Sequence, residues 1–266
     1  MGLSGFAVRN IRQFFGGGYV KEGPKLTFIH VPKCGGSSME VALKTALGLR
    51  AQITGRGSLS LDTVAALRAS EILGRENREY IEDLLPYHLA KSRLRYLTGH
   101  WALRDSVFEH FKEEWDFILL IRNPVKRFIS NYFFNRYKAD DHFRINEDLD
   151  DFVETYRAKF YGCAFVRYLA PDQFAYGDEP STAPVEKAIS NLDRFQIIGV
   201  LEHLDLMAGK FSEVYGAKLH IPHLNRNPVS SSSSKKDVTP EQMKAIEEIC
   251  RPDMQIYRKV LERILV

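Results

Sequence analysis

A short segment near the amino terminus combines residue types that bind anions. Residues 28–43 have the sequence FIHVPKCGGSSMEVAL. An apolar run comes first and a helical pattern comes last, and between them lie Lys33, Cys34, Gly35, Gly36, Ser37 and Ser38. Paired glycines let the backbone approach an anion closely, and free amides at the start of a helix point towards it. Lysine adds a positive charge and serine adds hydroxyl donors. The segment therefore predicts a phosphate-binding loop, although a Gly-Gly turn after a strand can also be purely structural.

This loop differs from the phosphate loop of nucleoside triphosphatases. Their motif, G-x-x-x-x-G-K-[ST], places lysine after the last glycine, followed by a serine or threonine for magnesium. Here Lys33 precedes both Gly35 and Gly36. An ATP-dependent phosphotransferase is therefore an alternative interpretation only, as is a nucleotide-binding protein without catalysis.

A second segment places an arginine at the end of an apolar run. Residues 116–134, DFILLIRNPVKRFISNYFF, have Arg122 after a predicted strand, then Asn123 and Pro124, then a helical pattern in which Ser130 lies eight residues after the arginine. A guanidinium group can direct two hydrogen bonds to one phosphate. Taken singly, Arg122 could form a surface ion pair and Ser130 could be an exposed helix residue.

Together, HVPKCGGSS (residues 30–38) and residues 116–134 resemble the two cofactor motifs of sulfotransferases that use 3′-phosphoadenosine 5′-phosphosulfate (PAPS). The branch most similar contains the heparan sulfate 2-O- and 6-O-sulfotransferases and many bacterial carbohydrate sulfotransferases. The resemblance implies that residues 33–38 bind the 5′-phosphosulfate and that Arg122 and Ser130 hold the 3′-phosphate. It extends over roughly residues 25–266 and is weakest from 140 to 184.

Sulfuryl transfer requires a base for the acceptor hydroxyl, and histidine is the usual general base near neutral pH. Among eight histidines, His100 follows a predicted strand, LRYLTG (94–99), and the resemblance implies that it is the base. Its alternative role is to hold the turn by hydrogen bonds. Lys33 would also offset charge on the departing phosphate. We expect His30, inside the first predicted strand, to be a core residue. No histidine spacing matches a metal site, so we predict no catalytic metal.

Later segments of the chain are candidates for further cofactor and acceptor contacts. In residues 223–242, Lys235 and Lys236 with neighbouring serines could close over the cofactor, although a solvated loop is an equal alternative. In residues 133–148, FFNRYKADDHFRINED, basic side chains lie beside acids and aromatic rings and would suit an anionic sugar chain; a solvated surface is the alternative. These basic residues are Arg136, Lys138, His142 and Arg144. We therefore expect a carbohydrate acceptor (a polysaccharide, oligosaccharide or glycolipid), and the sequence leaves a protein tyrosine or a small phenol open.

The elements needed to position these residues follow from the hydrophobic pattern. Continuous apolar runs at 25–31, 94–99, 115–121 and 195–200 predict strands buried on both faces, as in a parallel sheet. Helical patterns at 38–47, 124–137 and 204–215 alternate with them, and a capping box at Thr239 opens a helix that Pro252 should interrupt. We predict an α/β fold with a P-loop-like, doubly wound parallel sheet flanked by helices, in one domain (25–266) after an extension (1–24).

Composition narrows the compartment and the partners. The formal net charge is +3 and the pI about 8.6, which suits an anionic ligand but not a dedicated nucleic-acid binder. Three widely spaced cysteines form no disulfide pattern, and no apolar run approaches a membrane span. We therefore expect a cytoplasmic protein. The segment GFAVRNIRQFF (residues 5–15) could contact a membrane peripherally, although a docking helix or a loose tail fits it better.

Overall fold

The computed structural model describes residues 25–48, 57–139, 141–174, 181–222 and 238–265. The predicted extension 1–24, with its membrane contact, lies outside these residues. Lys235 and Lys236 also lie outside them. Within the described segments, no helix combines the length and the apolar character needed to cross a lipid bilayer.

A five-stranded sheet forms the centre of the molecule, and every neighbouring pair of strands is parallel. Its strands, in spatial order, are β2 (Ser58–Ser60), β3 (Tyr96–Gly99), β1 (Lys25–Ile29), β4 (Trp115–Ile121) and β5 (Ile197–Val200). The chain first builds the β2 side of β1 and then crosses to the β5 side, so the connections diverge between β1 and β4. In such sheets ligands bind beyond the carboxyl ends of the strands at this switch point.

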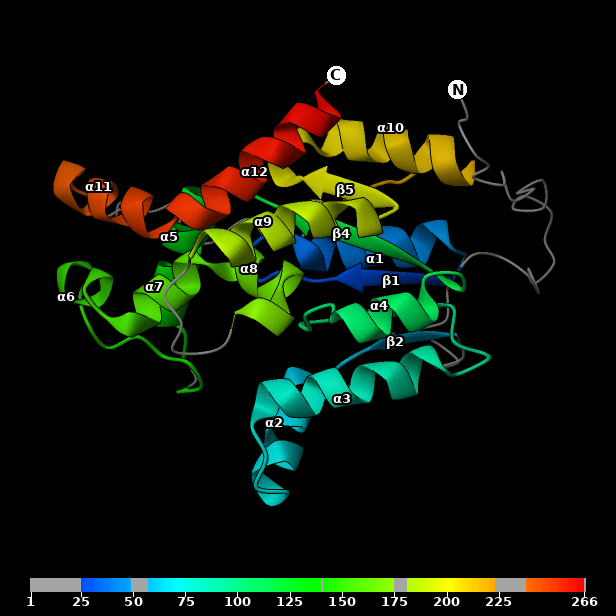
Figure 1. Cartoon of the computed structure of the whole chain (residues 1–266), viewed down its shortest axis with the longest axis horizontal. Helices are drawn as coiled ribbons and strands as arrows, with labels where there is room; N and C mark the ends of the chain where they lie inside the picture. The colour runs from blue at the N-terminus through cyan, green and yellow to red at the C-terminus, as the bar shows by residue number, and fades with distance from the viewer. Residues whose placement is uncertain (1–24, 49–56, 140, 175–180, 223–237, 266) are drawn as a thin grey trace.

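Helices cover both faces of the sheet, and further helices lie beyond its edges (Figure 1). They are α1 (Gly36–Ala46), α2 (Thr63–Ile72), α3 (Asn77–Leu89), α4 (Asp105–Phe111), α5 (Pro124–Tyr137), α6 (Leu149–Val153), α7 (Tyr156–Gly162), α8 (Ala164–Leu169), α9 (Thr182–Ser190), α10 (Leu204–Tyr215), α11 (Pro240–Ile249) and α12 (Arg251–Ile264). In Figure 1, α2 and α3 lie on the β2 side, whereas α10 and α12 lie on the β5 side. The single α/β domain with a helix-flanked parallel sheet confirms the predicted fold class.

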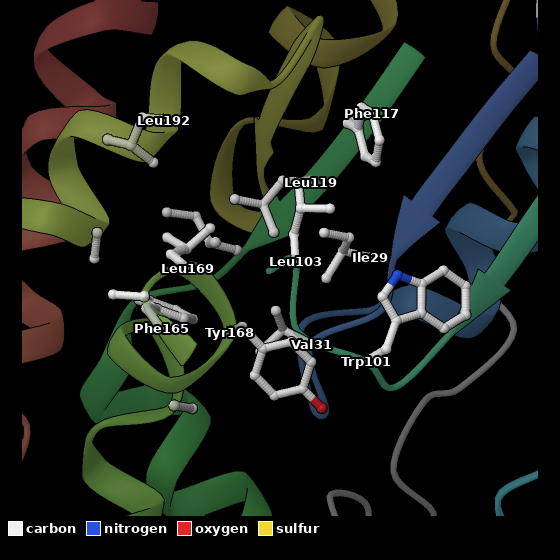
Figure 2. Packing of buried hydrophobic residues seen from close by; sticks show 14 of the residues in the cluster. Ile29, Val31, Trp101, Leu103, Phe117, Leu119, Phe165, Tyr168, Leu169 and Leu192 are labelled. Carbon is white, nitrogen blue, oxygen red and sulfur yellow. The ribbon is translucent and has the colours of Figure 1, made fainter. Parts of the chain in front are cut away.

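Alternation along the strands separates two hydrophobic cores. On β4, Phe117, Leu119 and Ile121 face a core that includes α3, α8, α9 and α12, and part of this core is shown in Figure 2. Ile118 and Leu120 face the opposite core, built with α1 and α10. Because successive strand side chains point to opposite faces, an uninterrupted apolar run is what a doubly covered strand requires.

The predicted element boundaries hold closely at the second motif and less well elsewhere. β4, α5 and α10 have the predicted limits, and the capping box at Thr239 is present. The C-terminal helix is divided at Cys250, two residues before Pro252, so the expected interruption is confirmed. β2 was not predicted, because the three residues Ser58–Ser60 give no apolar run.

Candidate active site

The predicted phosphate loop connects β1 to α1 at the carboxyl edge of the sheet. Two of its residues have positive φ, 66° at Lys33 and 82° at Gly35. This left-handed conformation is uncommon for a residue with a side chain, and it turns the chain sharply towards the start of α1. A side chain at Gly36 would place its Cβ 1.9 Å from the ring of His30. The backbone favours glycine at Gly35, where an added Cβ would also lie 2.7 Å from Leu201 Cδ1, and the histidine requires it at Gly36.

The loop presents its side chains to one large cleft. A cavity of about 2410 Å³ is lined by Lys33, Gly35, Gly36, Ser37 and Ser38, among others. Cys34 is different, because its thiol is buried in the core and is absent from the cleft wall. Burial raises the pKa of the Cys34 thiol to about 12, so it carries no thiolate at neutral pH. Cys34 therefore offers the cleft its backbone only.

Arg122 lies directly after β4 and reaches across to the loop. Its Nη1 donates a hydrogen bond to the Lys33 carbonyl oxygen at 3.2 Å, and its Nε is buried without a partner. Ser130, on α5, lines the same cleft. Asn123 supports this junction, because its side chain caps α5 and its backbone N–H donates to Glu202. Arg122 is thereby held at the sheet edge, and its Nε remains available to donate a hydrogen bond to a ligand.

Lys33 and Arg122 place two positive charges side by side at the cleft wall. Burial lowers the pKa of Lys33, and the neighbouring charge of Arg122 lowers it further. The Lys33 ammonium stands 3.8 Å from the centre of the Phe134 ring, and among the described residues neither cation forms an ion pair with a carboxylate. Anionic groups bound here would satisfy the buried Nε and relieve the repulsion, so this part of the cleft fits phosphate or sulfate groups.

His100 follows β3 and lies beside His30, which follows β1. The ring centroids are 4.4 Å apart, and His100 Nδ1 is 2.5 Å from the His30 carbonyl oxygen. A carbonyl can only accept, so Nδ1 of His100 carries the proton and Nε2 keeps its lone pair. Burial lowers the pKa of His100, against smaller opposing effects of that hydrogen bond and of Glu40. At neutral pH the ring is therefore a neutral proton acceptor on the cleft wall.

The expectation that His30 is a core residue is wrong. The strand ends at Ile29, although the His30 N–H still donates to the Gly99 carbonyl, and the ring lines the cleft over Gly36. Burial lowers the pKa of His30 to about 3, with His100 as a second cause. Its ring is consequently uncharged throughout the physiological range. The apolar run that continues to Val31 gave no sign of this turn.

Of the basic residues expected near an acceptor, only some lie on the cleft. Lys138 and His142 line it, whereas Arg136, in the last turn of α5, donates to the carbonyl oxygens of Ile145 and Asn146 in the loop that follows the helix. Arg144 forms an exposed ion pair with Asp141, 3.3 Å long. Three aromatic rings of the same segment, residues 133–148, are exposed on the cleft wall. They are Phe134, Tyr137 and Phe143.

Comparison with known families agrees with this geometry. The model of the sulfotransferase family matches residues 19–259, about nine-tenths of the chain, and includes both predicted cofactor motifs. The chain therefore belongs to the sulfotransferase family, whose enzymes transfer a sulfuryl group from PAPS. A search of curated protein sequences gives no match. In the part of the chain that the structure describes, no group of three or more His, Cys, Asp or Glu side chains is placed so that it could hold a metal ion.

Proposed function

We propose that this sulfotransferase transfers the sulfuryl group of PAPS to a hydroxyl of a carbohydrate, with His100 as the general base. The observation that carries the proposal is the position of a proton-accepting Nε2 on the same cleft as Lys33 and Arg122, two cations that form no ion pair among the described residues. Neither group alone would define a reaction. Together they supply an anion site and a base at one sheet edge, which is what transfer of an anionic group to a hydroxyl requires.

The loop residues and the residues that follow β4 are proposed to bind different parts of the donor. Lys33, Ser37, Ser38 and the backbone of 34–36 would hold the 5′-phosphosulfate, because amides, hydroxyls and an ammonium converge there. Arg122 and Ser130 would hold the 3′-phosphate, and Arg122 Nε is the donor in need of an acceptor. Lys235 and Lys236 are proposed to add charge to the same nucleotide.

The reaction moves one proton and one sulfuryl group. Nε2 of His100 takes the proton of the acceptor hydroxyl as its oxygen forms a bond to sulfur, and the bond between sulfur and the phosphate oxygen breaks. Lys33 stabilises the negative charge that grows on the departing phosphate, and 3′-phosphoadenosine 5′-phosphate (PAP) is released. No step needs a metal ion, and we propose none.

A carbohydrate acceptor suits the wall of the cleft beyond the loop. Exposed rings of Phe134, Tyr137 and Phe143 stand among polar side chains, and flat apolar faces of this kind can pack against sugar rings. The three cysteines are unpaired and buried, in keeping with a reducing compartment, so we propose that the enzyme acts in the cytoplasm. The catalytic unit is proposed to be residues 25–266.

Thermal unfolding with PAP, ADP and ATP plus magnesium tests the donor. A nucleotide at about 100 times its dissociation constant stabilises the fold by roughly 2.7 kcal/mol, a shift of several degrees. PAP should raise the melting temperature far more than ADP, which lacks the 3′-phosphate, and Arg122→Ala should remove that difference. A larger shift with ATP plus magnesium would instead indicate a phosphotransferase. Transfer of radiolabelled sulfate from PAPS to a panel of sugars, tyrosine peptides and phenols then tests the acceptor.

A further inference from the structure

The cleft continues from the phosphate loop into a second region where arginine side chains gather. Arg78 on α3, Arg104 before α4, Arg127 on α5 and Arg167 on α8 all line it. These residues lie far apart in the sequence, and of the four only Arg127 lies within a cofactor motif, that of residues 116–134. Guanidinium groups that line a cleft need anionic partners, so the carboxylates nearby decide whether the region is neutral.

Glu82 is the carboxylate that serves two of these arginines. Its side chain is buried, and it accepts from Arg78 Nε at 2.7 Å and pairs with Arg104 Nη2 at 2.5 Å. Asp172 adds a longer contact of 3.5 Å to Arg104. Glu82 and Asp172 thus hold Arg78 and Arg104 in position and offset their two positive charges.

Arg127 has a structural role. Its Nη2 donates to the Tyr161 carbonyl oxygen, and the side chain is buried. The buried carboxylate of Asp253 accepts instead from the backbone N–H groups of Phe165 and Val166. Asp253 therefore fixes the start of α8 and makes no hydrogen bond to Arg167 in the described structure.

Arg167 is left with a guanidinium group that has no carboxylate partner among the described residues. The group lies 3.7 Å from the centre of the Phe160 ring, and its Nε is buried without a hydrogen-bond partner. Arg78 Nη2 donates to the Arg167 carbonyl oxygen at 3.2 Å, so the two arginines are adjacent. Burial lowers the pKa of Arg167 to about 10, and the charges of Arg78 and Arg127 act in the same direction.

We infer that Arg167, held on Phe160 and next to Arg78, binds a carboxylate or sulfate group of the acceptor. This inference rests on the proposed carbohydrate sulfation and narrows it to an anionic carbohydrate. A guanidinium stacked on an aromatic ring keeps its in-plane donors directed into the cleft, where they match the two oxygens of such a group. The acceptor's anionic group thereby supplies the partner that Arg167 lacks among the described residues.

Binding of three matched oligosaccharides to the PAP-saturated protein tests the inference. The first alternates glucuronate and N-acetylglucosamine, the second is its carboxyl-reduced form, and the third is the reduced form after O-sulfation. Calorimetry should show tighter binding of the first or third than of the neutral second. Which of the two charged forms binds better identifies carboxylate or sulfate as the group recognised. Arg167→Gln should weaken binding of the charged form roughly ten- to hundred-fold, as expected for lost hydrogen bonds to a charged group.

Controls separate this inference from the proposed function. Arg251→Gln makes the same change of charge at an exposed ion pair with Glu248, and it should bind all three oligosaccharides like the wild type. PAP affinity reports on folding and on the donor site, so it should be unchanged in Arg167→Gln; Arg167→Lys serves if that variant does not fold. Charged probes that bind no better than the neutral one, or not at all, overturn the inference while PAP binding stands. Absence of PAP binding by the wild type would instead remove the proposed function.

Discussion

His100 Nδ1 lies 2.5 Å from the main-chain carbonyl oxygen of His30, and this contact joins the ends of β1 and β3. The carbonyl fixes both the tautomer and the orientation of the His100 ring, because only a protonated Nδ1 can donate to it. The two strands are paired in parallel, with Ile29 opposite Gly99, so the sheet register itself brings the two histidines together. A base is thereby oriented by backbone rather than by a carboxylate side chain.

Replacing His100 by asparagine should greatly lower turnover while keeping the turn. The asparagine amide can still donate to the His30 carbonyl, but it cannot accept a proton. Loss of a general base typically lowers the rate by about 10²–10⁴, and PAP affinity should be unchanged. His110→Asn is the matched control, because His110 is exposed on α4 and does not line the cleft. Wild-type turnover in His100→Asn would leave His100 with the structural role alone.

The pH profile of the reaction should show that the general base loses its proton at a lower pH than an ordinary histidine does. Burial lowers the pKa of His100, and a protonated ring cannot accept the hydroxyl proton. The acid limb of kcat/KM should therefore lie below about pH 6.5, the ordinary value for histidine. Steady-state rates between pH 5 and 8 measure it. A limb centred above 6.5 would contradict the burial argument, and the residual activity of His100→Asn should lack the limb.

His30 should make the fold sensitive to acid. Its folded pKa is about 3, below the unfolded value of 6.5, so the unfolded chain binds more protons between these pH values. Its contribution to stability is therefore complete above pH 6.5 and declines as the pH falls towards 3. Urea unfolding at pH 7 and pH 4.5 measures the decline, which should be smaller in His30→Asn. An equal decline in both proteins would assign the acid sensitivity to other groups.

The sequence was most informative where local pattern and chemistry coincide. β4 and α5 have their predicted limits because the strand is apolar on both faces and because Asn123 and Pro124 cap and start the helix. The same junction places Arg122, so a few consecutive residues determine both the cofactor motif and the position of its arginine. The fold class followed from this alternation of strands and helices.

Features that depend on distant contacts could not be predicted. Arg78 and Arg167 are 89 residues apart, and their proximity follows from the packing of α3 and α8 on the same sheet face. β2 forms only by pairing of its backbone with β3, a strand that lies more than thirty residues later in the chain. His30 was misplaced because its neighbours continue the apolar run, whereas the turn towards the cleft is imposed by the loop conformation at Lys33.

Lys33→Ala should lower turnover at saturating PAPS more than it lowers donor affinity. Its ammonium is held on the Phe134 ring beside Arg122, where it can stabilise charge on the departing phosphate. Removal of one such group typically costs about 10²–10³ in rate. Initial rates at saturating donor measure the effect, and Lys210→Ala, at an exposed ion pair with Glu213, is the control. Unchanged turnover would restrict Lys33 to binding.

Gly36→Ala should disable the phosphate loop through His30. An added Cβ would lie 1.9 Å from the His30 ring, which is itself packed against His100, so the loop or the ring must move. Titration should show a loss of PAP affinity, and His30→Ala in the same chain should restore part of it, because the obstructing ring is gone. Gly209→Ala is the control, since no atom other than those of its chain neighbours and its own helix backbone lies within 4 Å of its added Cβ. Alanine there should stabilise α10 by up to about 1 kcal/mol. If Gly36→Ala bound PAP normally, or if the double variant bound no better than the single one, the close contact between Gly36 and His30 would not be what shapes the loop.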